Sequence, residues 1–279
     1  MPGQEPDRQH YLQVARAFDQ AAENYDTLYR TNPVMAWLRR ESLAVLQATF
    51  PPGSRLLEIG CGTGEEALAL GRAGYRVVAT DISPAMIETA RAKAGAGQDN
   101  VTWRVLPAGR LAGLLDNHGP DNFDGAYASF GALNCEPDLA PTLEALAHLL
   151  RPGAALVCSV MNRWCAWEIA WGLLHLRPRQ AFRRLGKGWH DAGLASPEGR
   201  LAVPTRYYSP HDLTRLCRPH FRARLVRGLP VLLPPPYLAH LVARHPAFFA
   251  GIKKLERHLR DRFPFRAWGD HFLIVLEKA

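Results

Sequence analysis

The sequence lacks several features that would define whole classes of protein. It has no apolar run of the roughly 18 residues that a membrane-spanning helix needs, which excludes an integral membrane protein. The first ten residues are polar and have no apolar core, so no secretory signal is expected. The 23 glycines and 22 prolines follow no period, which excludes a collagen-like or low-complexity chain. With 47% apolar and 22% charged residues, the composition is typical of a globular protein.

Cysteine is also scarce and irregularly spaced. The five cysteines are odd in number, lie far apart in the sequence and form no Cys-x-x-Cys pair. Neither a disulfide framework nor a zinc site is therefore expected, and we predict no bound metal. Free cysteines are typical of a reducing compartment, so the predicted location is the cytoplasm.

Acidic residues are few in the second half of the chain. Residues 1–150 carry a net charge of −6, whereas residues 151–279 carry +14. A strongly basic half indicates an acidic partner, which could be an anionic substrate, a membrane surface or a nucleic acid. A solvated, arginine-rich surface without any such partner explains the same composition.

The pattern of apolar residues predicts alternating strands and helices, which is typical of a parallel sheet covered on both faces. Two helices are expected over 9–50, with a break at 31–33. The core would comprise 1–163, 207–233 and 269–279, with helical cap insertions at 164–206 and 234–268. The expected strands are 55–59, 75–81, 101–106, 123–129, 154–161, 221–229 and 271–277.

The strongest motif is Glu58-Ile59-Gly60-Cys61-Gly62-Thr63-Gly64, which follows an expected strand and begins an expected helix. Glycines at such a turn let the backbone bend tightly and approach a ligand without an intervening Cβ. No Lys-Ser or Lys-Thr follows, so the motif is not a phosphate-binding P-loop. Asp81 ends the next strand, where a carboxylate can accept hydrogen bonds from both hydroxyls of a ribose.

These residues resemble motif I and the ribose-binding acid of class I S-adenosylmethionine-dependent methyltransferases of the small-molecule type (methyltransferase domains 11 and 25). The segments 18–26, 122–124 and 150–153 support the resemblance, which covers roughly 10–162, a short stretch near Tyr207 and the last strand. It implies a Rossmann-like α/β fold with a seven-stranded, mostly parallel sheet whose last strand is antiparallel. It also implies S-adenosylmethionine as cofactor and S-adenosylhomocysteine as product.

The resemblance also implies which residues bind the cofactor. Glu58 would lie near the amino group, Asp81 would hold the ribose, and Ile82 would pack on the adenine. Met86 is either part of the adenine pocket or plain core. The full predicted set is Glu58, Gly60, Cys61, Gly62, Gly64, Asp81, Ile82, Met86, Ala108, Gly109, Ser129 and Phe130.

One position departs from the family pattern. Many relatives carry an aspartate after the third strand that contacts the adenine amino group, but the segment 106–110 has no carboxylate. Backbone groups of Ala108 or Gly109 are the expected replacement.

Residues for the methyl acceptor are less well defined by the sequence. His190 is a weak candidate for a general base, and a solvated or core histidine is the alternative. Asn134 either orients the acceptor or caps a turn, and Tyr25 and Tyr29 either gate the pocket or form the apolar face of a helix. The predicted substrate-pocket set is Tyr25, Tyr29, Asn134, Trp164, His190 and Tyr207.

The sequence thus predicts a methyltransferase for a small, partly apolar molecule with an O, N or C acceptor atom, and an anionic group on it would match the basic half. An RNA or protein methyltransferase and a non-catalytic cofactor-binding scaffold subunit are the alternatives. No nucleic-acid-binding module is recognisable, so no nucleic acid partner is expected. Peripheral contact with a membrane is compatible with the mixed aromatic and basic insertions, and the sequence leaves the oligomeric state open.

Overall fold

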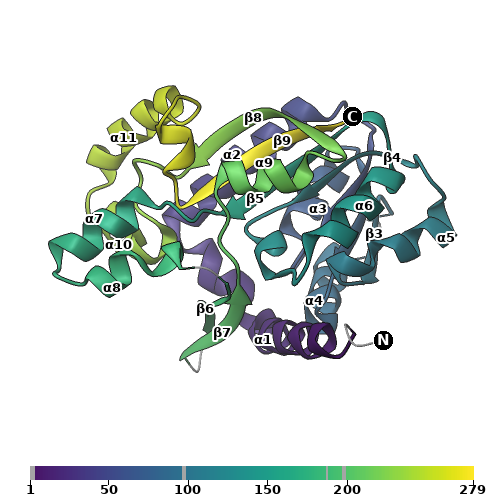
Figure 1. Ribbon diagram of the computed structural model, residues 1–279, viewed down its shortest axis with the longest axis horizontal. Helices are drawn as coiled ribbons and strands as arrows, with labels where there is room; N and C mark the ends of the chain where they lie inside the picture. The colour runs from purple at the N-terminus through teal and green to yellow at the C-terminus, as the bar shows by residue number, and fades with distance from the viewer. Residues whose placement is uncertain (1–3, 96–98, 187, 197–198) are drawn as a thin grey trace.

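A single twisted sheet forms the centre of the molecule (Figure 1). The computed structural model describes residues 4–95, 99–186, 188–196 and 199–279. The strand order is β3-β2-β1-β4-β5-β9-β8, and β9 runs antiparallel to both of its neighbours while the others are parallel. The predicted fold class is therefore confirmed. The strands are β1 (Arg55–Ile59), β2 (Arg76–Asp81), β3 (Val101–Val105), β4 (Phe123–Ala128), β5 (Leu150–Met161), β8 (Phe221–Leu229) and β9 (His271–Lys278).

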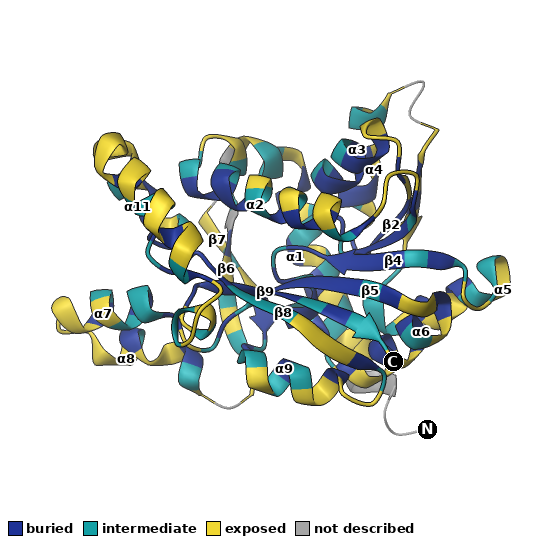
Figure 2. Ribbon diagram, turned by 90° about the horizontal axis from the view of Figure 1, so that it is seen from above, coloured by how far each residue is buried: buried dark blue, intermediate teal, exposed yellow. Residues whose placement is uncertain are grey.

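Helices cover both faces of this sheet, as Figure 2 shows from above. One face carries α2 (Pro33–Thr49), α3 (Glu65–Arg72) and α4 (Pro84–Ala94), and the other carries α5 (Leu115–His118), α6 (Leu139–Leu149) and α9 (Pro210–Cys217). The central strands are apolar on both faces because each face packs against helices. Two 3₁₀ segments, η1 (Ala108–Leu114) and η2 (Ala132–Cys135), follow β3 and β4.

The helix boundaries are set by capping residues that the sequence displays. Helix α1 (Gln4–Arg30) ends before Asn32, whose side chain accepts hydrogen bonds from the Val34 and Met35 amides and so caps α2. Ser83 caps α4 in the same way, with Pro84 at the first helical position. The predicted breaks at both places are confirmed.

The first insertion is only partly helical, so the prediction of a purely helical cap was wrong there. After α7 (Ala166–Leu174), α8 (Pro178–Ala181) and η3 (Arg183–Leu185), the chain forms an antiparallel hairpin of β6 (His190–Ser196) and β7 (Gly199–Thr205). Leu194 and Val203 pack against small residues of α1, so the hairpin buries one face there. Residues 187, 197 and 198 of this insertion lie outside the described residues.

The second insertion is helical, as predicted, and packs against α2. It contains η4 (Pro236–Leu238), α10 (Ala239–Arg244), α11 (Pro246–Leu259) and η5 (Phe265–Ala267). Its core residues Leu233, Val242 and Phe249 contact Trp37 and Leu38 of α2. The two insertions lie at one end of the sheet (Figure 1), and the domain boundaries given above stay a prediction.

Candidate functional site

A cavity of about 400 Å³ opens at the carboxyl ends of β1, β2 and β4. The strand order reverses between β1 and β4, and open α/β sheets bind ligands at such a switch point. Helix α1, the hairpin and both insertions close the other sides. Predicted site residues on its wall are Tyr25, Tyr29, Gly60, Cys61, Gly62, Asp81, Ile82, Ala108, Ser129, Phe130 and Tyr207.

The three glycines of the turn have two different tasks. All have positive φ, at +67° for Gly60, +53° for Gly62 and +77° for Gly64. Gly60 and Gly62 line the cavity, and a Cβ on Gly62 would meet no atom within 4 Å. A Cβ on Gly64 would instead collide with the Trp103 ring, so Gly64 allows α3 to pack closely against β3. The assignment of Gly64 to cofactor binding is therefore corrected to a packing role.

Asp81 lies at the end of β2 with its carboxylate on the cavity wall. Its oxygens accept hydrogen bonds from the amides of Gly62 and Ser83, both at 2.8 Å. Burial raises the pKa of Asp81 to about 6, although these amide hydrogen bonds oppose that shift. A buried carboxylate that is fixed on the glycine turn and still faces the cavity matches the ribose-binding role.

Glu58 has a different position from the predicted one. It is 1% exposed and lies beside Tyr127 of β4, behind the turn rather than on the cavity wall. Burial raises its pKa well above the usual value. Glu66, in the first turn of α3, does line the cavity, and its Oε1 atom is buried without a hydrogen-bond partner. Sequence reasoning missed Glu66, although its place two residues after the glycine turn was visible.

Helix α1 is held over the glycine turn by charged side chains. Asp26 accepts hydrogen bonds from the Thr63 hydroxyl and the Lys93 ammonium, both at 2.6 Å. Asp19 accepts from the Ser83 hydroxyl at 2.5 Å. These contacts place the aromatic face of α1, including Tyr25 and Tyr29, on the cavity wall.

A carboxylate also lies on the cavity wall together with residues of the segment after β3. Glu136, which follows η2, lies on the wall near Ala108 and accepts a hydrogen bond from the Tyr11 hydroxyl. Burial raises the pKa of Glu136 to about 7. Gly109 lies behind the wall, where a Cβ would meet the Tyr11 and Glu136 side chains. Met86 is fully buried in the cluster between α1 and α4, which favours core over pocket.

Three of the predicted acceptor residues lie away from the cavity. The amide of Asn134 is fully buried and bridges Met161 and Arg206 backbone atoms, so it braces the chain. Trp164 is 45% exposed, outside the cavity wall. His190 stacks on Tyr207 from behind, and its Nε2 atom lies 3.2 Å from the Gly186 carbonyl.

A buried ion-pair cluster forms the end of the cavity opposite the glycine turn. Arg184 is 4% exposed and contacts Glu168 at 2.7 Å and Asp270 at 2.6 Å. Cys165, Glu168 and Asp270 lie close enough together to ligate a cation. The Arg184 guanidinium already supplies a positive charge to both carboxylates, which explains the cluster without a metal ion.

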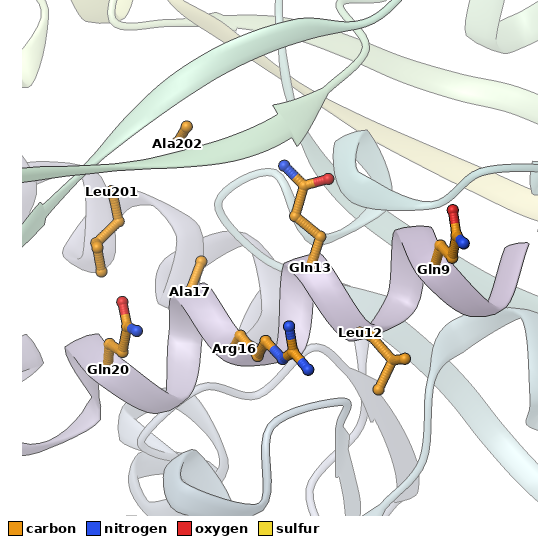
Figure 3. Close-up of a pocket in the computed structure, with 8 residues that line it drawn as sticks. All are labelled: Gln9, Leu12, Gln13, Arg16, Ala17, Gln20, Leu201 and Ala202. Carbon is orange, nitrogen blue, oxygen red and sulfur yellow. The ribbon is translucent and has the colours of Figure 1, made fainter. Parts of the chain in front are cut away.

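A second pocket, of about 350 Å³, lies between the outer face of α1 and β7 (Figure 3). Glutamine and apolar side chains dominate it, and it contains no pair of groups suited to acid–base chemistry. Its residues are Gln9, Leu12, Gln13, Arg16, Ala17, Gln20, Leu201 and Ala202.

The fold and the cavity resemble those of class I S-adenosylmethionine-dependent methyltransferases. The residues fit the cofactor, because Gly62 leaves open space beside the turn, Asp81 lines the cavity, and Glu66, which lies 3.7 Å from Arg39, has a buried oxygen without a hydrogen-bond partner on the same wall. Residues 56–153 match the family model of a methyltransferase domain. The resemblance predicted from the sequence is thereby confirmed.

Comparisons with known proteins agree with this class. The chain is 30% identical over 165 residues to demethylmenaquinone methyltransferase of Symbiobacterium thermophilum, covering 56% of this chain and 63% of that protein. It is 36% identical over 139 residues to ubiquinone biosynthesis O-methyltransferase of Xylella fastidiosa, covering 50% and 53%. The chain thus spans less than two thirds of the length of these relatives.

The fold is shared with solved methyltransferase structures. One is the 1,6-didemethyltoxoflavin-N1-methyltransferase of Burkholderia thailandensis with bound 1,6-didemethyltoxoflavin and S-adenosylhomocysteine. It has a TM-score of 0.59 and 16% identity, covering 98% of this chain and 89% of that chain. Within the described ranges, no helix of this protein is long and apolar enough to cross a membrane.

Proposed function

We propose that this protein is an enzyme that transfers a methyl group from S-adenosylmethionine to a small, partly apolar molecule. The observation that carries the proposal is that one cavity is lined both by the glycine turn with Asp81 and by a set of aromatic side chains, whose part of the cavity we call its second compartment. The sulfonium of the cofactor supplies an electrophilic methyl group with its own leaving group. The protein therefore mainly has to align an acceptor with it and exclude water.

The walls of the second compartment support an aromatic acceptor. Tyr25, Tyr29, Phe130, Tyr207 and Tyr237 line it, and Tyr25 and Tyr29 stack on each other at 4.6 Å between ring centroids. Flat aromatic rings favour flat ligands by offset stacking. The two quinone-pathway names among the relatives are compatible with such an acceptor.

Two alternatives remain, a macromolecular substrate and a non-catalytic cofactor-binding subunit. Closure of the cavity by α1 and the insertions favours a small acceptor over RNA or protein, which would need an open face. Labelled methyl transfer into size-fractionated cell extract separates the three cases. We expect label in the small-molecule fraction, loss of that label with Asp81→Asn, and full label with the exposed control Asp116→Asn.

Peripheral contact with an anionic membrane surface is part of this proposal, because an apolar acceptor partitions into lipid. The turn between α7 and α8 exposes 75% of Leu174 and 89% of Leu176. Arg177 and Arg179 follow directly and are exposed. Exposed leucines beside arginines are suited to insertion between anionic headgroups. The cytoplasmic location stays a prediction.

A further inference from the structure

The start of β9 brings an aspartate and a histidine together on the cavity wall. The Nδ1 atom of His271 lies 2.9 Å from Oδ2 of Asp270, and both residues line the cavity. His271 pairs with Met161 of β5 and Leu229 of β8, so the backbone that carries it is fixed on both sides by the sheet. The ring is 8% exposed, which shields it from bulk water.

Asp270 is fixed in turn by Arg184. The Arg184 guanidinium donates to Oδ1 of Asp270 at 2.6 Å and to the Asp270 carbonyl at 3.0 Å. Burial opposes ionisation of Asp270, but Arg184 and His271 together hold its pKa below its usual range. A charged Asp270 accepts a hydrogen bond from Nδ1–H of His271, and this contact selects the tautomer whose Nε2 atom carries a lone pair.

The Nε2 atom has no competing hydrogen bond among the described residues. The charged and titratable groups around this end of the cavity come from several elements. They are Asp270 just before β9, Arg183 and Arg184 on η3, Glu168 on α7, Cys165 before α7, Tyr207 after β7 and Tyr237 on η4. Glu168 is engaged by both arginines, whereas the Nε2 atom of His271 is not engaged by either of them.

We propose that His271, oriented by Asp270, is the general base of the reaction and that the acceptor atom is a hydroxyl oxygen on an aromatic or quinol-like ring. This inference rests on the proposed function. The acceptor oxygen forms a bond to the methyl carbon as the carbon–sulfur bond breaks and its electron pair stays on sulfur. The hydroxyl proton passes to Nε2 of His271 and later to water. A neutral amine acceptor can attack before losing a proton and would have less need of this base.

The orientation is tested without any turnover. In the full chain labelled with ¹⁵N-histidine, the ring nitrogens of His271 are assigned by comparison with His271→Gln. We expect the neutral ring to carry its proton on Nδ1, and Asp270→Asn to shift population towards Nε2–H. A neutral wild-type ring protonated on Nε2 overturns the proposal, because that atom could not accept a proton. The position of the proton on the wild-type ring therefore tests the proposal even if the Asp270→Asn variant fails to fold.

The catalytic role is tested with a panel of phenols, catechols and quinols as probe acceptors. We expect His271→Gln to lower kcat about 10²–10⁴-fold at pH 7, the range typical of a lost general base, with an S-adenosylhomocysteine Kd within about threefold of wild type. The deficit shrinks at high pH, where the phenol ionises in solution. The exposed control His258→Gln keeps wild-type rates.

The outcomes separate the two levels of the proposal. A His271→Gln kcat within threefold of wild type, or a deficit that does not change with pH, overturns the base assignment. Wild-type protein that binds cofactor but methylates only amines in a parallel panel overturns the hydroxyl acceptor. Wild-type protein that fails to bind S-adenosylhomocysteine contradicts the proposed function itself.

Discussion

Asp81 links cofactor binding to pH. Burial raises the pKa of Asp81 to about 6, so in the folded protein this carboxyl group stays protonated up to a higher pH than is usual for an aspartate. The resulting stabilisation is complete below pH ~4 and is lost as the pH rises through about 6. In the proposed ribose-binding role, the ribose hydroxyls would donate to the charged carboxylate and favour its ionised form, so we expect cofactor binding to release a proton in this window.

The first prediction follows from this linkage. We expect the S-adenosylhomocysteine Kd of the wild type to fall about tenfold between pH 5 and pH 8, because the ionised fraction of Asp81 rises by about that factor. Calorimetric titration in two buffers of different ionisation enthalpy measures both affinity and proton release. Asp81→Asn should bind more weakly by about 1.5–3 kcal/mol at pH 8 and lose the pH dependence. An unchanged Kd in this variant contradicts the ribose assignment.

The two glycines at 62 and 64 give the second prediction. Gly64→Ala should lower the free energy of unfolding by about 2–4 kcal/mol, because it adds a left-handed alanine and a clash with Trp103. Gly62→Ala has no such clash and should lose only about 1–2 kcal/mol, but its methyl group would obstruct the cofactor. Urea unfolding and calorimetry should therefore rank the two variants in opposite orders. Equal stability of the two would contradict the packing role of Gly64.

At the residue scale, the sequence predicts a position on the cavity wall where the local backbone geometry requires a particular residue type. Gly60, Gly62 and Asp81 lie at fixed distances along a strand–turn–helix unit, so local sequence predicts their place. Glu136 and His271 are brought to the cavity by β4 and β9, elements distant from the turn in sequence. Their roles depend on long-range packing, and no spacing rule in a single sequence encodes it.

At the scale of elements, the local sequence predicts the strands of the central sheet, but it does not predict the hairpin of the first insertion. The central strands β1, β4 and β5 contribute buried apolar residues to the clusters on both faces of the sheet, so a mostly apolar run identifies each of them. In β7, burial increases towards the end of the strand, where Val203, Pro204 and Thr205 are all buried, and the strand is short and pairs with β6. Its contacts with α1 stabilise it, and these are tertiary contacts that a local pattern does not reveal.

The turn between α7 and α8 gives the third prediction. It lies at the end of the molecule far from the C-terminus (Figure 1). We expect the protein to sediment with vesicles of phosphatidylglycerol more than with vesicles of phosphatidylcholine. The double variant Leu174→Ser and Leu176→Ser should reduce this binding at least about tenfold, because each inserted leucine contributes about 1.5–3 kcal/mol.

A matched control comes from α1. Leu12 is 46% exposed on that helix, and Leu12→Ser should leave vesicle binding unchanged. Equal sedimentation with neutral and anionic vesicles would show that the arginines beside the turn do not attract lipid headgroups. Loss of binding with raised salt is expected, since exposed charges are screened over about 10 Å at 0.1 M.

At the scale of the whole molecule, several arginines of the basic second half are held in internal ion pairs. Glu168 and Asp270 neutralise Arg183 and Arg184, Glu41 pairs with Arg257 and Arg260, and Asp261 pairs with Arg227. Fewer arginines of this half are therefore free to bind a ligand than its composition alone suggests. On the cavity wall, Arg39 of the first half pairs with Glu66 at 3.7 Å, whereas Arg200 on β7 has no acidic partner within the described part of the chain.

The fourth prediction asks whether Arg200 recognises an anionic group on the acceptor. A hydroxylated aromatic acid and its methyl ester differ only in one charge, so their kcat/KM ratio reports that recognition. We expect the wild type to prefer the acid about tenfold at low salt, equivalent to about 1.4 kcal/mol. Arg200→Gln should bring the ratio close to one, whereas the exposed control Arg222→Gln on β8 should preserve it. Raising the salt should weaken the wild-type preference, because Arg200 is exposed and its field is screened. Equal turnover of acid and ester at low salt would mean that the arginines of the basic half do not recognise the acceptor. The aromatic walls alone would then select it.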